Sequence, residues 1–195
     1  LKLKTFFKEI RKNIIKGLKS ITSNMEKRGG GINSLELVDM NNKIDSYYQI
    51  FVKFTTIDSM GANFINTCLE KITEIFKSFI EEKQFLDKND EKIDFIMSIL
   101  SNYTPNCLVK SSVECKVEDL EENNELKVDN FISAVKISKI DTFRAVTHNK
   151  GIMNGIDSVV IATGNDFRSV EAGIHAYASR NGNYSGLSNA YIKKG

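Results

Sequence analysis

Residues 47–80 read YYQIFVKFTTIDSMGANFINTCLEKITEIFKSFI, and this stretch decides the fold of the first half of the chain. Over Tyr47–Thr56, apolar side chains alternate with polar ones, which is the period of a half-buried β-strand. After a turn at Asp58–Asn63, apolar side chains recur every three or four residues, as in a helix with one buried face. A strand followed by an amphipathic helix is therefore predicted. The apolar positions of this helix are Phe64, Ile65, Cys68, Leu69, Ile72, Ile75, Phe76, Phe79 and Ile80.

Three further elements extend this pattern outward. Residues 1–28 are predicted to be an amphipathic helix that ends at the glycines Gly29–Gly31, and Ile32–Val38 alternates as another strand. Ile93–Leu100 is predicted to be a buried strand. The order helix, strand, strand, helix, strand matches a ferredoxin-like fold whose first strand is missing. The predicted fold class is α+β.

The composition is that of a globular protein. Of the 195 residues, 41% are hydrophobic and 27% are charged, which argues against a disordered chain or a disulfide scaffold. The predicted domains are 1–105 and 106–195, the second rich in helix. Apolar runs such as Val159–Ala162 are far shorter than the ~20 residues of a membrane span. Three cysteines and two histidines without metal-like spacing indicate reduced thiols, a cytoplasmic protein and no metal.

Positive charge is concentrated at the start of the chain. Residues 1–28 hold nine lysines or arginines against two glutamates. Such a stretch can contact nucleic acid, a membrane surface or a phosphate-bearing cofactor, or it can be the solvated face of a helix. The solvated face is the expectation here, with no nucleic-acid or membrane partner, and polyanion binding is the alternative.

The stretch most suggestive of chemistry centres on Lys150. Lys150 and Asn154 are four residues apart, so they share a face if a helix begins at this point. A lysine at a helix N-terminus opposes the helix dipole, which suggests a role such as binding an oxyanion. A predicted break at Gly164–Asn165 leaves Asp166 to cap the next helix. The alternative is an ordinary exposed lysine and a capping aspartate with no further role.

A second candidate site is the turn Asp58–Asn63. It joins a strand to a helix, where free backbone N–H groups can hold a phosphate, and Gly61 allows close backbone approach. The chain contains no GxGxxG dinucleotide fingerprint. The alternative is an ordinary turn in which Asp58 caps the helix.

Several ordered motifs resemble those of the bacterial-type, class II hydroxymethylglutaryl-CoA reductases. The resemblance extends from about residue 10 to about residue 190, and it departs from the family at Ser59, where the family has alanine. The motifs are RGGG at Arg28–Gly31, DSMGAN at Asp58–Asn63, SILSN at Ser98–Asn102, RAVTHNKGIMN at Arg144–Asn154, GIDSVVIATGND at Gly155–Asp166 and HAYASR at His175–Arg180.

The resemblance implies an architecture and an activity. A small ferredoxin-like cofactor domain is inserted into a larger, helix-rich substrate domain, and the protein is a homodimer with active sites at the subunit interface. The implied reaction is the NAD(P)H-dependent reduction of hydroxymethylglutaryl-CoA to mevalonate and CoA, or its reverse. NADH is slightly favoured over NADPH as the cofactor, and coenzyme A is part of the substrate. The alternative is a non-catalytic protein of the same fold that binds a dinucleotide or a CoA ester.

The resemblance also implies roles for individual residues. Lys150 matches the catalytic lysine, Asp166 the aspartate that hydrogen-bonds it, and Arg144 and Asn154 the residues that hold the substrate's carboxylate and neighbouring oxygens. The family's catalytic glutamate and histidine have no counterpart in residues 1–195, so this chain is expected to be an incomplete fragment and crippled on its own. The implied cofactor-binding residues are Asp58, Met60, Gly61, Ala62 and Asn63.

Overall fold

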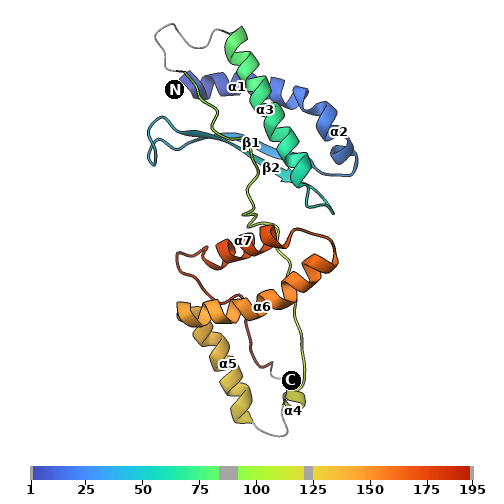
Figure 1. Ribbon diagram of the computed structural model, residues 1–195, viewed down its shortest axis with the longest axis vertical. Coiled ribbons are helices and arrows are strands. Elements are labelled where there is room, and N and C mark those ends of the chain that lie inside the picture. Colours follow the sequence, from blue (N-terminus) through green and yellow to red (C-terminus); the bar gives the residue numbers. More distant parts are fainter. Residues whose placement is uncertain (1, 84–91, 121–124, 194–195) are drawn as a thin grey trace. The chain divides into compact units, whose positions relative to one another are not determined.

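The structure is a computed structural model that describes residues 2–83, 92–120 and 125–193. The chain divides into two compact units, Leu1–Leu100 and Ser101–Gly195, and each is described by itself. Helices and a small antiparallel sheet make up the described residues, which agrees with the predicted α+β class (Figure 1). The assignment of the two halves to a cofactor domain and a substrate domain stays a prediction. None of the helices in the described ranges is long and apolar enough to cross a membrane.

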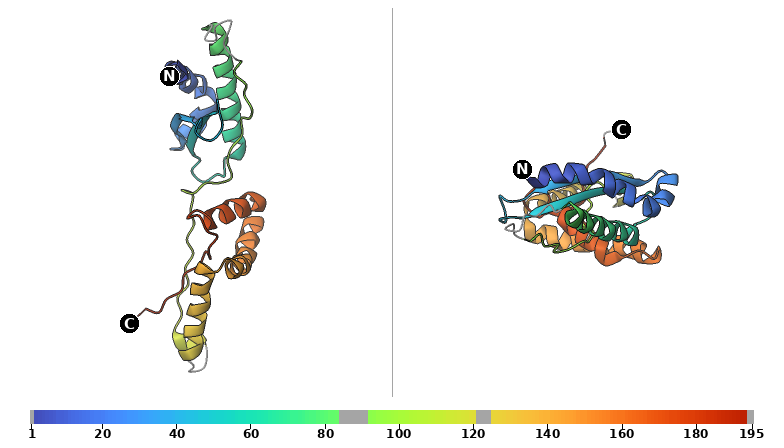
Figure 2. Two further views of the ribbon diagram at one scale, coloured as in Figure 1. Left: turned by 90° about the vertical axis from the view of Figure 1, so that its left-hand side faces the viewer. Right: turned by 90° about the horizontal axis from the view of Figure 1, so that it is seen from above.

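The first unit is a two-stranded antiparallel sheet with helices on one face (Figures 1 and 2). The strands pair from Gly31 opposite Thr55 to Asp39 opposite Tyr48, with an irregularity between Ile32 and Ser34. The strands predicted at Ile32–Val38 and Tyr47–Thr56 and both predicted helical stretches are confirmed, although the first helical stretch is divided at Leu18. The elements are α1 (Lys2–Gly17), α2 (Lys19–Lys27), β1 (Gly31–Asp39), β2 (Tyr48–Thr55) and α3 (Ala62–Glu82).

The core of this unit lies between α1, α3 and β1. The apolar stripes of the two helices face each other, and the ring of Phe6 packs against Phe76 and Phe79 at centroid distances of 5.6 and 5.3 Å. Burial of these side chains is the main force that holds the helices on the sheet. The core residues are Phe6, Phe7, Ile10, Ile14, Leu18, Leu35, Cys68, Ile72, Phe76 and Phe79.

The predicted buried strand at Ile93–Leu100 is wrong. The segment is neither helix nor strand, and Ile96 and Ile99 are 76% and 65% exposed. It is bound to α3 instead, where the Leu100 N–H donates to Asn66 Oδ1 and the ring of Phe95 packs against Phe76. A strand needs a neighbouring strand for its backbone hydrogen bonds, and β1 and β2 pair only with each other within the described part of the chain.

The second unit is helical. Residues 128–135 lie within α5, and residues 151–161 lie within α6 (Figure 1). The predicted break after residue 163 is confirmed, because Gly164 has a φ of 70° and a new helix follows Asp166. The elements are α4 (Val117–Leu120), α5 (Glu125–Ile140), α6 (Thr142–Ala162) and α7 (Phe167–Ala178).

Candidate functional site

Lys150 lies in the middle of α6, not at its start. The helix begins at Thr142 and is capped by Asp141, whose carboxylate accepts a hydrogen bond from the Phe143 N–H. The sequence argument that Lys150 opposes the dipole at a helix N-terminus is therefore wrong, because the dipole acts on the first and last turns. The helix begins eight residues before Lys150, so Lys150 and Asn154 do share one helix but not its first turn.

The residues expected to hold substrate share the outward side of α6. Arg144, Lys150 and Asn154 are all exposed, and the opposite side of the helix is buried at Ala145, Asn149 and Met153. On a helix with 3.6 residues per turn, Lys150 and Asn154 are about 40° apart, and Arg144 and Asn154 are about 80° apart. Arg144 and Lys150 are about 120° apart, so the guanidinium, the ammonium and the amide are spread over a broad exposed face of α6.

Two glycines leave this face open. A Cβ added at Gly151 or Gly155 would meet nothing within 4 Å. Both glycines are exposed and lie next in sequence to Lys150 and Asn154. Backbone without side chains beside these two polar groups lets a ligand or another chain approach α6 closely.

Asp166 is the N-cap of α7. Its Oδ1 accepts hydrogen bonds from the N–H groups of Arg168 and Ser169 at 3.1 and 3.4 Å, and from Arg168 Nε at 3.3 Å. Desolvation raises the pKa of Asp166, but the hydrogen bonds from Arg168 and Ser169 outweigh it and hold the pKa below its ordinary value. No hydrogen bond or ion pair joins Asp166 to Lys150 in the part of the chain that the structure describes. The carboxylate is therefore ionised near neutral pH and held in place by the helix it caps.

The turn before α3 is built around Gly61. Gly61 is the N-cap of the helix at a φ of 72°, and an added Cβ would collide with the methyl group of Thr56. The Thr56 hydroxyl donates to the Ser59 carbonyl at 2.7 Å, and the Ser59 hydroxyl donates to the Thr56 carbonyl at 2.8 Å. Asp58 does not cap the helix, so the capping role given to it in the alternative is wrong. No side chain caps α3, and its first turn contains no acidic residue.

These features fit an anion. The first backbone N–H groups of a helix have no partner within it, and they attract phosphate oxygens when no side chain competes. The exposed side chains of Met60 and Asn63 flank this position. The turn can therefore hold the phosphates of a dinucleotide, and Met60 can contact an apolar part of it.

The fold brings a second glycine-rich stretch to this turn. Arg28 forms an ion pair with Asp58, and a Cβ at Gly30 would collide with the carbonyl of Thr55. In the sequence, Arg28–Gly31 is a motif of the resemblance only, and no pattern predicts that it lies beside residues 58–63. The ion pair joins the two glycine-rich stretches, and the charge of Arg28 is balanced there by Asp58.

The basic face of α1 is exposed, with Lys8, Arg11, Lys12 and Lys16 all on the surface. The apolar side of the same helix is buried in the core of its unit. This is the arrangement expected of a solvated helix face. Among the described residues there is no cluster of three or more His, Cys, Asp or Glu that could hold a metal ion.

Comparison with known proteins identifies the family. The family model for hydroxymethylglutaryl-coenzyme A reductase matches residues 2–194. The chain belongs to this family. The "3-hydroxy-3-methylglutaryl-coenzyme A reductase" of Archaeoglobus fulgidus is 32% identical over 154 residues, which are 79% of this chain and 32% of the relative. The "Probable 3-hydroxy-3-methylglutaryl-coenzyme A reductase" of Borreliella burgdorferi is 32% identical over 195 residues, 97% of this chain and 42% of the relative.

Solved reductase structures agree with this family assignment. A 3-hydroxy-3-methylglutaryl-coenzyme A reductase from Streptococcus pneumoniae superposes with a TM-score of 0.71 at 29% identity, covering 97% of this chain and 43% of that one. A class II reductase from the same organism, bound to NADPH in open conformations, has a TM-score of 0.68 at 29% identity and covers 94% of this chain and 47% of that one. The chain thus spans less than half the length of these reductases. The expected preference for NADH receives no support, because the cofactor in that relative is NADPH.

Proposed function

We propose that this chain carries out part of the NAD(P)H-dependent reduction of hydroxymethylglutaryl-CoA to mevalonate and CoA, or the reverse reaction. The observation that carries this proposal is the family match across residues 2–194, together with the exposed Arg144, Lys150 and Asn154 on one side of α6. An exposed lysine and a capping aspartate would also be found if Lys150 and Asp166 had no role in catalysis. The choice of a reductase therefore rests on the family and not on the geometry of α6 alone.

Lys150 is proposed to stabilise the negative charge that develops on the carbonyl oxygen of the thioester. A positioned cation has this effect most strongly at an oxygen that becomes an oxyanion in the transition state. Arg144 suits the carboxylate of the hydroxymethylglutaryl group, because a guanidinium can donate two parallel hydrogen bonds to it. Asn154 can donate to or accept from a neighbouring hydroxyl or carbonyl. Asp166 is proposed to pair with Lys150 when substrate is bound.

The cofactor is proposed to bind at the turn before α3, in a ferredoxin-like small domain inserted into the larger domain. When bound, NADH or NADPH supplies the hydride for each of the two reductions. The proposed contacts are Asp58, Met60, Gly61, Ala62 and Asn63. Three features support this proposal. No side chain caps the N-terminus of α3, a Cβ at Gly61 would collide with Thr56, and Arg28 pairs with Asp58 in this turn.

The proposed partner is a second copy of the chain, with the active site at the interface. Several apolar side chains on and beside α6 are exposed, including Phe143 at 81% and Val159 at 63%. Covering these side chains with a second copy would remove apolar area from water, which supports an interface at α6. A cytoplasmic location and a crippled activity of residues 1–195 alone stay predictions.

The test is a comparison of Lys150→Ala with Lys136→Ala in the protein with its natural flanking sequence. Lys136 is an exposed lysine of α5 and serves as the matched control. We expect Lys150→Ala to lower kcat by about 10²-fold or more, since it removes the group that stabilises the oxyanion, and Lys136→Ala to leave kcat unchanged. Turnover is followed by oxidation of NADPH and, separately, of NADH. A loss of less than about tenfold in Lys150→Ala contradicts the assigned role. The non-catalytic alternative predicts cofactor or CoA-ester binding with no turnover even before substitution.

A further inference from the structure

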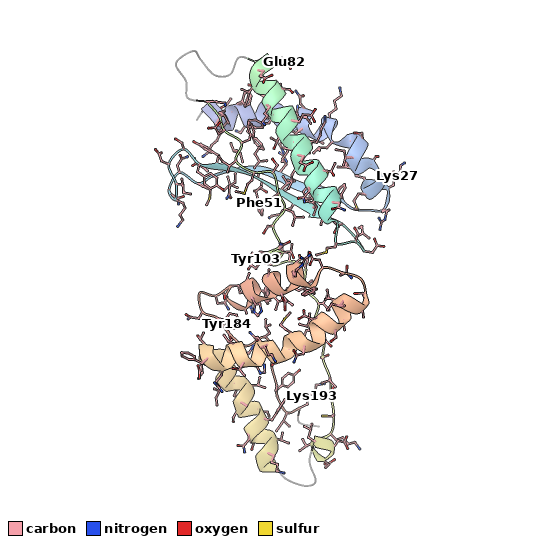
Figure 3. The ribbon with its side chains drawn as sticks, in the orientation of Figure 1. Lys27, Phe51, Glu82, Tyr103, Tyr184 and Lys193 are labelled. Atoms are coloured by element: carbon pink, nitrogen blue, oxygen red, sulfur yellow. The ribbon has the colours of Figure 1, made fainter. Side chains whose placement is uncertain are left out.

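Five residues after α7 are bound to the helices of the second unit at both ends. This clasp segment is Tyr184–Ser188. The hydroxyl of Tyr184, which is labelled in Figure 3, lies 2.8 Å from Nδ1 of His175 on α7. At the other end, the hydroxyl of Ser188 lies 2.5 Å from Nε2 of His148 on α6. Both histidines of the chain thus hold this one short segment.

The backbone in the middle of the clasp segment is joined to α5 and α7. The Ser185 N–H donates to the carbonyl of Ala178 at 3.1 Å, and the Gly186 N–H donates to the carbonyl of Ser138 at 2.8 Å. Lys139 Nζ donates to the Gly186 carbonyl at 2.6 Å. Gly186 is buried, and a Cβ there would collide with the Ser138 hydroxyl. The N–H groups of Ser185 and Gly186 and the carbonyl of Gly186 therefore each have a directed partner.

Besides His148, the side chain of Asn149 connects α6 to the clasp segment. This residue is 0% exposed. Its Nδ2 donates to the Ser185 carbonyl at 3.0 Å, and its Oδ1 accepts from the Leu187 N–H at 2.9 Å. One amide thus bonds to the backbone on both sides of Gly186, as a paired strand would. Its buried neighbours on the same face, Ala145 and Met153, make apolar contacts, which are not directional.

We infer that Asn149 is a positioning residue for Lys150. The two directed bonds of Asn149, beside the contact of His148 with Ser188, fix the rotation of α6 about its own axis against the clasp segment. Because Lys150 is the next residue, this rotation decides where its Cα lies and hence which positions its ammonium reaches. A displacement of about 1 Å at a reacting group can cost about 10²-fold in rate. The inference rests on the proposed function of Lys150.

The test compares Asn149→Leu with Tyr184→Phe. Asn149→Leu keeps the approximate volume, removes both hydrogen bonds of Asn149 to the clasp segment and leaves the contact of His148 with Ser188 in place. Tyr184→Phe, the matched control, removes one bond from the same segment to α7 and leaves α6 alone. We expect kcat to fall by about 10- to 100-fold in Asn149→Leu and by less than about threefold in Tyr184→Phe. NADPH affinity stays unchanged in both variants, because the proposed cofactor turn belongs to the other unit.

Hydrogen exchange supplies a readout that does not depend on turnover. The Leu187 N–H should exchange faster in Asn149→Leu than in Tyr184→Phe, since its acceptor is gone. If Asn149→Leu does not fold, Asn149→Ser takes its place, because a serine leaves room for a bridging water and should cost less.

Two results separate the inference from the function on which it rests. If Lys150→Ala is inactive while the Asn149 variant has the kcat of Tyr184→Phe, the inference is overturned and the proposed function stands. If Lys150→Ala keeps its activity, the proposed function fails, and the inference fails with it.

Discussion

Cys68 lies in the core of the first unit, where it is 0% exposed, and burial raises the pKa of its thiol to about 11. The unfolded chain ionises this thiol near its ordinary pKa of 9.0, so the folded state keeps its proton longer. The free energy of unfolding is therefore expected to decrease as the pH rises from about 9 to about 11. Cys68→Ala should lose this part of the pH dependence, and the difference between the two denaturation curves measures it.

The same burial predicts which thiols react. Cys107 and Cys115 are exposed, whereas Cys68 is not. A thiol reagent at neutral pH should modify two cysteines quickly and the third only as the protein unfolds. Counting modified thiols by mass spectrometry with and without denaturant checks this. Rapid modification of all three in the folded protein contradicts the burial of Cys68.

The turn that begins α3 depends on one backbone conformation. Gly61→Ala places a side chain at a φ of 72° and against Thr56, so we expect a loss of stability of about 1 kcal/mol or more and weaker NADPH binding. Gly182→Ala is the control, because Gly182 has a φ of 92° with nothing within 4 Å of an added Cβ. Chemical denaturation and a cofactor titration measure the two effects. If both variants bind NADPH as tightly as the parent chain, this turn is not the cofactor site.

Helices and strands with one buried face could be predicted from the sequence, because the period of the apolar side chains reports the face directly. This holds for β1, β2 and α3. The prediction was wrong at Ile93–Leu100, where a short apolar run lies along α3 without a strand partner. The local sequence does not distinguish such a run from a buried strand. The start of α6 was predicted wrongly for another reason. Phe143 and Val146 are apolar yet 81% and 53% exposed, so the apolar side chains near the start of α6 do not follow one buried face.

Contacts between residues far apart in the chain could not be predicted from the sequence. The ion pair of Arg28 with Asp58 joins two motifs that the chain separates by 30 residues. Asn149 meets the clasp segment across 36 and 38 residues. Neither residue type has a spacing rule that predicts such a partner. The resemblance to the reductases supplied the site residues instead, and their roles stay proposals.

At the scale of the whole molecule, the proposed functions are divided between the two units. The cofactor turn belongs to the first unit, and Lys150 belongs to the second. A hydride can pass only between bound molecules that touch, so the proposed reaction requires both units in one working assembly. Substitutions in one unit should therefore change the affinity for one ligand and the turnover, but not the affinity for the other ligand.

The exposed apolar side chains of the second unit bear on the proposed dimer. Phe143 is 81% exposed at the start of α6, on the helix that carries Lys150. If a second copy covers this surface, Phe143→Glu places a charge in an apolar interface and should convert a dimer to a monomer with lower turnover. Ile44→Glu is the control, because Ile44 is 62% exposed on the hairpin of the first unit. Sedimentation measures the mass of each variant, and circular dichroism shows whether its helices remain. A Phe143→Glu protein that stays dimeric, or a parent protein that is already a monomer, contradicts the proposal that copies of this chain meet at α6.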